Sequence, residues 1–195
     1  VYNAVSKEFS KNEDKSLFGK KNFMAVSSVK ENKNFIYILE AFKRFSLHDR
    51  NVELFIIGDL KSKSFKTIDV SKYTENKKIK ILGRVSDQEL VRYYSNATAF
   101  IFPSLYEGFG IPPLEAQACG CPAICAKASC LPEVFGESVL YCNPWDIDSL
   151  VDDMKMLISE PSIRESLIEK GYHNVSRYSW DNSAMKMSEV LEKFI

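Results

Sequence analysis

Short strand-length apolar segments alternate with segments of helical spacing along almost the whole chain. Six of them are rich in residues that favour strands, and they lie at 22–29, 52–57, 79–82, 97–103, 122–126 and 138–142. The fourth (ATAFIFP) is apolar at consecutive positions, which is typical of a central strand buried on both faces. Strands that alternate with helices form βαβ units, in which the strands run parallel. The pattern therefore predicts an α/β fold, a doubly wound parallel six-stranded sheet with helices on both faces and further helices at the C-terminus.

The helices between these strands are predicted from apolar spacing and from residues that cap helix ends. Apolar side chains recur at helical spacing over 35–45, with Asn32 or Asn34 as the N-cap. Ser86 and Glu89 form an S-x-x-E capping box ahead of the helix that follows the third strand. Further helices are predicted at 112–120, from 146 onward, at 162–170 and, after an N-cap at Ser179, at 180–194.

Composition limits the function classes that fit this chain. A chain of 195 residues, 45% of them hydrophobic, has the length and composition of a single globular domain. Its 26 basic residues balance its 26 acidic residues. A dedicated nucleic-acid-binding protein carries a basic excess, so nucleic acid is not expected as a partner. No apolar run approaches the ~20 residues of a membrane-spanning helix. Eight basic and two acidic residues lie within 61–84, a patch that either contacts phosphates or anionic lipid or is simply solvated.

The five cysteines lack the spacing of a metal site. They are crowded into 119–142 without a paired C-x-x-C motif or a nearby histidine, so no metal is expected. Free thiols are typical of a reducing compartment, and residues 1–10 do not resemble a signal or transit peptide, so we expect a cytoplasmic protein. The first residue is Val1, and the chain is therefore interpreted as a fragment of something longer.

The segment 104–120 (SLYEGFGIPPLEAQACG) carries the residues with the clearest chemistry. It follows the fourth strand, and ligands of doubly wound sheets bind beyond the carboxyl ends of the strands. Gly108 and Gly110 let the backbone approach a ligand, and the helix start after them favours an anion such as a diphosphate. Glu107 and Glu115, in an E-x7-E spacing, can both face one molecule and accept hydrogen bonds from sugar hydroxyls. The simpler alternatives are an exposed loop acid at Glu107 and a helix-dipole contact by Glu115 in the first helical turn.

This segment and its surroundings resemble a known enzyme family. The run YEGFGIPPLEAQACGCPAI, followed by LPEVFGESVLYCNPWD, resembles the donor-binding half of the retaining glycosyltransferases of family 4, which have the GT-B architecture. The resemblance covers nearly the whole chain through VYNAVSKEF, SSVKENKN, FIIGD, KILGRVSDQELVRYYSNATAFIFPS and RYSWDNSA. It implies an interdomain linker and lead-in at 1–20 and a Rossmann-like donor-binding domain at 21–178. It also implies a C-terminal helix at 179–195 that packs back toward an N-terminal acceptor domain missing from this chain.

The resemblance implies roles for particular residues. Glu107 would hydrogen-bond the donor sugar near the transfer site, and Lys33 would pair with the diphosphate and stabilise the leaving group, which makes these two the expected catalytic residues. Glu115 would hold the ribose hydroxyls of the nucleotide. The other expected donor-binding residues are Ser28, Arg84, Val85, Gly108, Phe109, Gly110 and Ile111. No metal ion or other cofactor is expected, because the nucleotide sugar is a substrate and the family usually works without a metal.

The implied function is transfer of a hexose from a nucleotide diphosphate sugar to a saccharide or lipid-linked acceptor, in bacterial polysaccharide or O-antigen-like glycan synthesis. The acceptor would bind to the absent domain, so we expect the isolated chain to be inactive. We also expect the protein to make peripheral contact with the inner face of the membrane. Two alternatives stay open, a GT-B-type nucleotide-sugar epimerase and a non-catalytic nucleotide-binding module. The second is favoured slightly, since Ser28 and Asn32 stand where family members often carry an arginine. A dinucleotide-dependent oxidoreductase is disfavoured, because the first strand leads into SSVKEN and not a G-x-G-x-x-G turn.

Overall fold

The computed structural model describes residues 1–12, 21–26, 31–58, 73 and 75–194. These residues form a six-stranded sheet in the order β3-β2-β1-β4-β5-β6, and every neighbouring pair of strands is parallel. The strands are β1 (Lys21–Val26), β2 (Val52–Ile57), β3 (Ile79–Gly83), β4 (Ala99–Phe102), β5 (Ala123–Ala126) and β6 (Leu140–Cys142). The predicted doubly wound parallel sheet is therefore confirmed, and β4 is a central strand with every residue buried.

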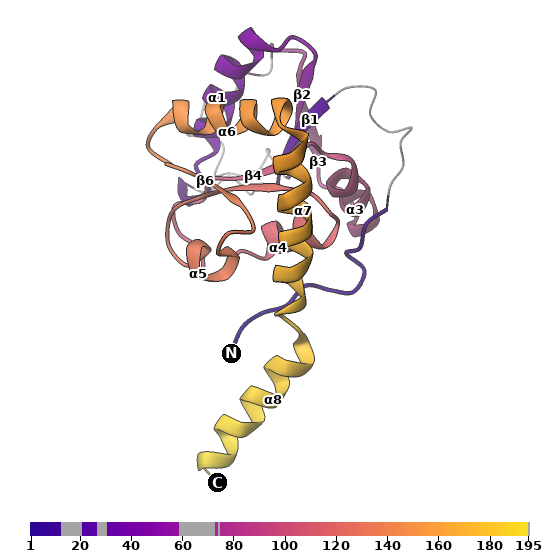
Figure 1. Ribbon diagram of the computed structural model, residues 1–195, viewed down its shortest axis with the longest axis vertical. Coiled ribbons are helices and arrows are strands. Elements are labelled where there is room, and N and C mark those ends of the chain that lie inside the picture. Colours follow the sequence, from indigo (N-terminus) through magenta and orange to yellow (C-terminus); the bar gives the residue numbers. More distant parts are fainter. Residues whose placement is uncertain (13–20, 27–30, 59–72, 74, 195) are drawn as a thin grey trace.

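Helices cover both faces of this sheet (Figure 1). They are η1 (Glu31–Lys33), α1 (Phe35–His48), α3 (Asp87–Asn96), α4 (Ile111–Ala118), α5 (Leu131–Phe135), α6 (Ile147–Ser159), α7 (Pro161–Ser176), α8 (Trp180–Leu191) and η3 (Glu192–Phe194). One face packs against α1 and α6, and the other against α3, α4 and α5. The short helix α5 was not predicted, and α7 is longer than the helix expected at 162–170.

The sheet divides the hydrophobic core into two layers. On one face, the ring of Phe23 in β1 packs edge-on against Phe45 of α1, with ring centroids 5.5 Å apart. On the other face, Phe100 of β4 packs edge-on against Tyr94 of α3, with centroids 5.3 Å apart. Consecutive side chains of a strand point to opposite faces, so an entirely apolar strand supplies both layers at once.

Side chains cap the starts of some of the helices, and backbone conformation sets the start of another. The capping box before α3 is confirmed: the Ser86 hydroxyl accepts from the Glu89 N–H at 3.3 Å, and the Ser86 N–H donates to the Glu89 carboxylate at 2.9 Å. Ser179 caps α8 by accepting from the Asn182 N–H at 3.1 Å. Asn34 precedes α1 as predicted, but its backbone is left-handed (φ 52°) and its side chain makes no cap. Asn34 is therefore confirmed as the N-cap residue by position, and its side-chain amide donates to the Pro144 carbonyl at 2.9 Å.

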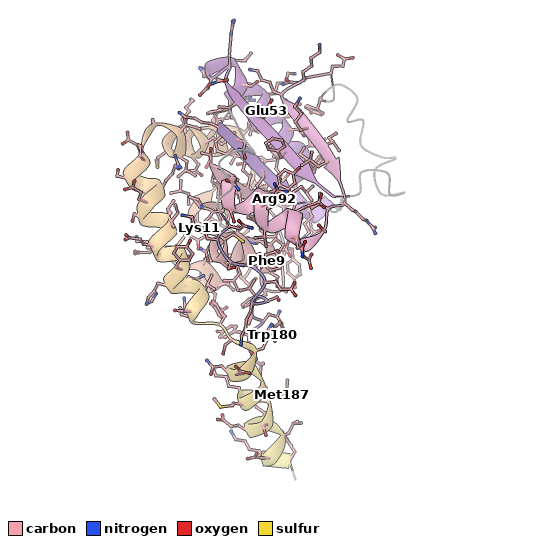
Figure 2. All side chains as sticks on the ribbon, turned by 90° about the vertical axis from the view of Figure 1, so that its right-hand side faces the viewer. Phe9, Lys11, Glu53, Arg92, Trp180 and Met187 are labelled. Atoms are coloured by element: carbon pink, nitrogen blue, oxygen red, sulfur yellow. The ribbon has the colours of Figure 1, made fainter. Side chains whose placement is uncertain are left out.

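Residues 1–12 pack onto the domain, whereas α8 extends away from it (Figures 1 and 2). Ala4 and Phe9 are buried in the core layer that contains Tyr94. By contrast, α8 buries none of its side chains, and Figure 2 shows Trp180 and Met187 on a helix that stands clear of the body. The packing of this helix on another domain stays a prediction.

The cysteines of the structure are all free thiols. Cys130 is half-buried, and the other four are buried. Within the described ranges, no helix is long and apolar enough to cross a lipid bilayer. Ser28 and most of the basic stretch 61–84 lie outside the described residues.

Candidate functional site

The loops that follow β4 and β6 are tied together at the carboxyl edge of the sheet by the segment around η1. The side-chain amide of Asn32 donates to the Tyr106 carbonyl at 3.0 Å, and the Asn32 carbonyl accepts from the Leu105 N–H at 2.8 Å. Two residues later, the Asn34 amide donates to the Pro144 carbonyl at 2.9 Å. These bonds hold the two loops at fixed positions around Lys33, which lies between the two asparagines.

Lys33 and Glu107 form an ion pair at the centre of this edge. The Lys33 Nζ lies 2.5 Å from Glu107 Oε1, and the two side chains are only 20% and 14% exposed. The Lys33 ammonium also lies 5.1 Å from the ring centroid of Phe102, the last residue of β4, in a cation–π contact. The resemblance assigned these residues to different parts of one ligand, and the structure brings them into direct contact. The exposed-acid alternative for Glu107 is therefore wrong.

The backbone of Glu107 is held by the loop after β5. The Ser129 hydroxyl donates to the Glu107 carbonyl at 2.9 Å and accepts from the Glu107 N–H at 3.3 Å. The Cys130 thiol donates to the same carbonyl at 3.3 Å. Sequence reasoning missed Ser129, because a serine in a loop carries no signal of which distant backbone group it will bind.

The two glycines of the loop differ in what surrounds them. Gly110 has a φ of +98°, and a Cβ there would lie 2.9 Å from Leu131 and 3.0 Å from Phe135, so this position requires glycine. Gly108 is exposed and has open space around it. Since Pro112 and Pro113 carry no N–H, the amides available to a ligand at the start of α4 are those of residues 108–111.

Phe109 contributes its backbone to this loop, while its side chain points into the protein. Its ring packs against Tyr178 and Tyr2, with centroids 5.2 and 6.0 Å away. Tyr2 belongs to the N-terminal segment, and Tyr178 lies between α7 and α8. The loop is therefore supported by two segments at opposite ends of the chain.

Glu115 lies in α4 on the side of Tyr94. It is the fifth residue of a helix that begins at Ile111, not part of the first turn, so the helix-dipole alternative is wrong. The buried Tyr94 hydroxyl donates to its carboxylate at 3.4 Å. Burial raises the pKa of Glu115 to about 7, and the nearby Asp87 adds to this shift. Glu115 is only half-buried, so its carboxylate is able to accept hydrogen bonds from a ligand.

Of the remaining predicted site residues, Ser28 lies outside the residues that the structure describes, and the others lie near the same edge. Arg84 is exposed and Val85 half-buried, directly after β3. Ile111 is exposed at the first position of α4. Among the side chains that the structure describes, no three of His, Cys, Asp or Glu are grouped so that they could hold a metal ion. The edge therefore presents the Lys33 ammonium, the exposed Arg84, two carboxylates and several amides, which suits a ligand with both an anionic part and hydroxyl groups.

A comparison with known protein families shows to which family the chain belongs. The sequence model of the family described as glycosyl transferases group 1 matches residues 6–174. The chain belongs to this family. The resemblance read from the sequence is thus confirmed, and Glu107, Lys33 and Glu115 all fall within the matched part of this group 1 glycosyl transferase.

Individual relatives support the same conclusion. The O-antigen chain mannosyltransferase B of Escherichia coli is 38% identical over 104 residues, which is 53% of this chain and 27% of the relative. The MMP alpha-(1->4)-mannosyltransferase of Mycolicibacterium hassiacum is 30% identical over 163 residues, 82% of this chain and 39% of the relative. The sucrose-phosphate synthase structure from Thermosynechococcus elongatus shares the fold, with a TM-score of 0.85 at 20% identity over 99% of this chain and 51% of that one. The group 1 glycosyl transferase described here spans well under half the length of these two mannosyltransferases.

Proposed function

We propose that this chain binds the nucleotide diphosphate sugar donor of a retaining hexosyltransferase that builds a polysaccharide or O-antigen-like glycan. The observation that carries the proposal is the Lys33–Glu107 pair beside the glycine loop at the start of α4. One side chain suits the anionic diphosphate and the other suits the hydroxyl groups of the sugar. Such a pair, only 2.5 Å apart, suits a ligand in which these two chemical groups are directly bonded.

Transfer requires that the bond between the sugar C1 and a diphosphate oxygen breaks, with the electron pair leaving on that oxygen. The Lys33 ammonium and the amides of residues 108–111 stabilise this developing charge. Glu107 orients the sugar through its hydroxyls. The acceptor oxygen forms the new bond to C1, and its proton passes to the departing diphosphate oxygen. Glu115 accepts hydrogen bonds from the ribose, and the backbone near Arg84 and Val85 lines the base.

The sugar is proposed to be mannose, because two relatives are named as mannosyltransferases. The acceptor binds to a further domain of the full-length protein, and the exposed side chains of α8 pack against that domain. The protein works in the cytoplasm, with peripheral contact at the inner membrane face to which the basic stretch 61–80 contributes.

Calorimetric titration of this chain with GDP, UDP, GDP-mannose and UDP-glucose tests the proposal. We expect saturable binding of one nucleotide and its sugar conjugate, lost in Glu115→Ala. Glu137→Ala, at an exposed acid of the turn before β6, is the matched control and keeps full affinity. Absence of binding at millimolar concentration in a folded chain would overturn the proposal. Binding by the full-length protein without any transfer would instead favour the non-catalytic nucleotide-binding module.

A further inference from the structure

Two aromatic side chains are strongly exposed at the edge that carries the Lys33–Glu107 pair. Tyr106 is 74% exposed and directly precedes Glu107, and Trp145 is 79% exposed in the loop between β6 and α6. Tryptophan is highly buried on average in folded proteins, because its large apolar surface is costly to hydrate. A tryptophan exposed to this degree next to a ligand site therefore indicates that a ligand or partner covers its ring.

The loop that carries Trp145 is rigidly built. The Tyr37 hydroxyl, which is largely buried, lies within hydrogen-bond distance of the carbonyls of Asn143 (2.8 Å) and Asp146 (3.0 Å) on both sides of it. The backbone N–H of Trp145 donates to the side-chain oxygen of Asn143 at 3.2 Å, and the neighbouring Pro144 is buried. A backbone held by these contacts needs little ordering when a ligand binds to the loop, which reduces the entropy lost on binding.

Hydrogen bonds from Asn32 and Asn34 also fix the position of the Trp145 loop relative to the proposed transfer site. Asn34 binds the carbonyl of Pro144, the residue before Trp145, and Asn32 binds the carbonyl of Tyr106. Lys33 lies between these two asparagines in the chain and contacts Glu107. The backbone positions of Tyr106 and Trp145 are therefore fixed relative to the ion pair from two neighbouring points of one short segment.

The charges near Trp145 indicate the kind of partner. Asp146 follows it in the chain and is exposed, with one carboxylate oxygen accepting from the Asp148 N–H at 3.1 Å, and the exposed Asp148 pairs with Arg44 at 2.8 Å. Carboxylates disfavour an anionic lipid surface, which needs basic residues around a tryptophan. They are good acceptors for hydroxyl groups, and an exposed indole face suits the C–H face of a pyranose ring.

We propose that Trp145, together with Tyr106, forms a platform for the saccharide acceptor, so that this half of the enzyme contributes to acceptor recognition. The inference rests on the proposed donor function, because it places the acceptor glycan next to the donor sugar at Lys33 and Glu107. The ligand class is a neutral oligosaccharide, which stacks on the Trp145 ring and donates hydroxyl hydrogen bonds to the carboxylates beside it.

The chain contains only two tryptophans, Trp145 and Trp180, so Trp180→Phe leaves Trp145 as the single indole fluorophore. We expect mannotriose to cause a saturable blue shift or quenching of its emission. In saturation-transfer NMR, Trp145→Ala weakens mannotriose binding by about tenfold, the order of loss for one ring contact. Trp180→Ala, which removes an exposed tryptophan of α8, leaves that binding unchanged.

Separate arms distinguish the failure of this inference from the failure of the donor function. GDP and UDP titrated against Trp145→Ala test the donor site alone, and we expect their binding to be unchanged. If a nucleotide binds but mannotriose neither shifts Trp145 emission nor loses affinity in Trp145→Ala, the platform is wrong and the donor function stands. If phosphatidylglycerol vesicles shift the emission while mannotriose does not, a membrane contact replaces the proposal. If mannotriose binds at Trp145 but the chain binds no nucleotide, the surface binds saccharides but is not an acceptor site, and the proposal is wrong.

Discussion

The Lys33 ammonium and the Glu107 carboxylate lie 2.5 Å apart although their positions are separated by 74 residues in the sequence. One follows β1 and the other follows β4, and these two strands are neighbours in the sheet. The parallel order therefore brings the two residues to the same edge. Because both side chains are largely buried, the pair differs from a surface salt bridge, and removal of one partner leaves the other charge uncompensated.

Substitutions that break the Lys33–Glu107 pair should destabilise the protein, and the effects of substituting the two residues should not be additive. Lys33→Met keeps much of the side-chain volume near Phe102 but removes the charge, and we expect it to lower the free energy of unfolding by about 1–3 kcal/mol. Glu107→Gln should have a similar effect, and the double variant should lose at least about 1 kcal/mol less than the sum of the single losses. Urea denaturation of the four proteins measures this difference. Additive losses would show that the two charges do not stabilise each other.

The same variants should separate binding of the diphosphate from binding of the sugar. In Glu107→Gln, the Lys33 ammonium loses its competing carboxylate, so a plain nucleoside diphosphate should bind as well as or better than in the unmodified protein. The advantage of the sugar conjugate over the plain nucleotide should shrink, because a sugar contact is lost. Lys33→Met should weaken both ligands by about tenfold, equivalent to one charge-assisted hydrogen bond. Calorimetry with GDP and GDP-mannose decides between these outcomes, and equal losses for both ligands in Glu107→Gln would contradict the assignment.

The two glycines of the donor loop should respond differently to alanine. Gly110→Ala places a Cβ at a positive φ and within 3.0 Å of Leu131 and Phe135, so we expect a loss of about 2–4 kcal/mol in unfolding free energy. Gly108→Ala meets open space, so it should change stability by less than about 0.5 kcal/mol. Thermal denaturation measures the difference, and nucleotide-sugar titration of Gly108→Ala reports whether its added methyl group obstructs the ligand. A stable Gly110→Ala chain would mean that the loop has a different backbone conformation.

The raised pKa of Glu115 predicts a pH-dependent stability. A folded-state pKa of about 7, above the ordinary value of 4.5, means that the proton is bound more tightly in the folded chain. The stabilisation is complete below about pH 4.5 and is lost as the pH rises through 7. Glu115→Gln does not titrate, so above pH 7 it should gain on the order of 1–3 kcal/mol relative to the unmodified protein, with no such gain at pH 4. Melting curves over pH 4–8 test this, and a constant difference between the two proteins would refute it.

Glu115 should also make nucleotide affinity depend on pH. The ionised carboxylate accepts hydrogen bonds from both ribose hydroxyls, whereas the protonated form retains less acceptor capacity. Affinity for the nucleotide should therefore rise from pH 6 to pH 8 in the unmodified protein, and Glu115→Gln should bind weakly at both values. Titrations at the two pH values measure this effect.

Thiol labelling should follow burial. Burial raises the pKa of Cys119 to about 12, and it also raises the pKa of the half-buried Cys130. In the native protein we expect Cys130 to react first with iodoacetamide, slowly because its thiolate is scarce, while the buried thiols react only in denaturant. Since Cys130 contacts the Glu107 carbonyl, a bound donor should slow its labelling. Mass spectrometry of digested protein identifies the modified residue, and equal rates at all five cysteines would contradict the packing.

Much of the architecture could be predicted from the sequence because the decisive signals are local. The apolar run of β4, the capping box of Ser86 and Glu89 and the cap at Ser179 each depend on residues within one turn or one strand. The glycine loop of 104–120 was also recognisable, since its composition is set by backbone requirements such as the positive φ of Gly110. The strand alternation was sufficient for the parallel sheet, because a βαβ connection leaves few arrangements.

The tertiary structure alone decided which of these residues meet. Asn34 is the N-cap residue of α1 by position, but its amide binds Pro144, a residue 110 positions away. Glu107 is compatible with an exposed acid in the sequence, but the structure places it against Lys33, and burial raises the pKa of Glu115. The spacing of residues in the sequence shows which side chains can act together within one helix, strand or loop. The partner, burial and electrostatic environment of each group come from segments that the sheet order brings together, and these long-range contacts are set only when the whole domain is packed.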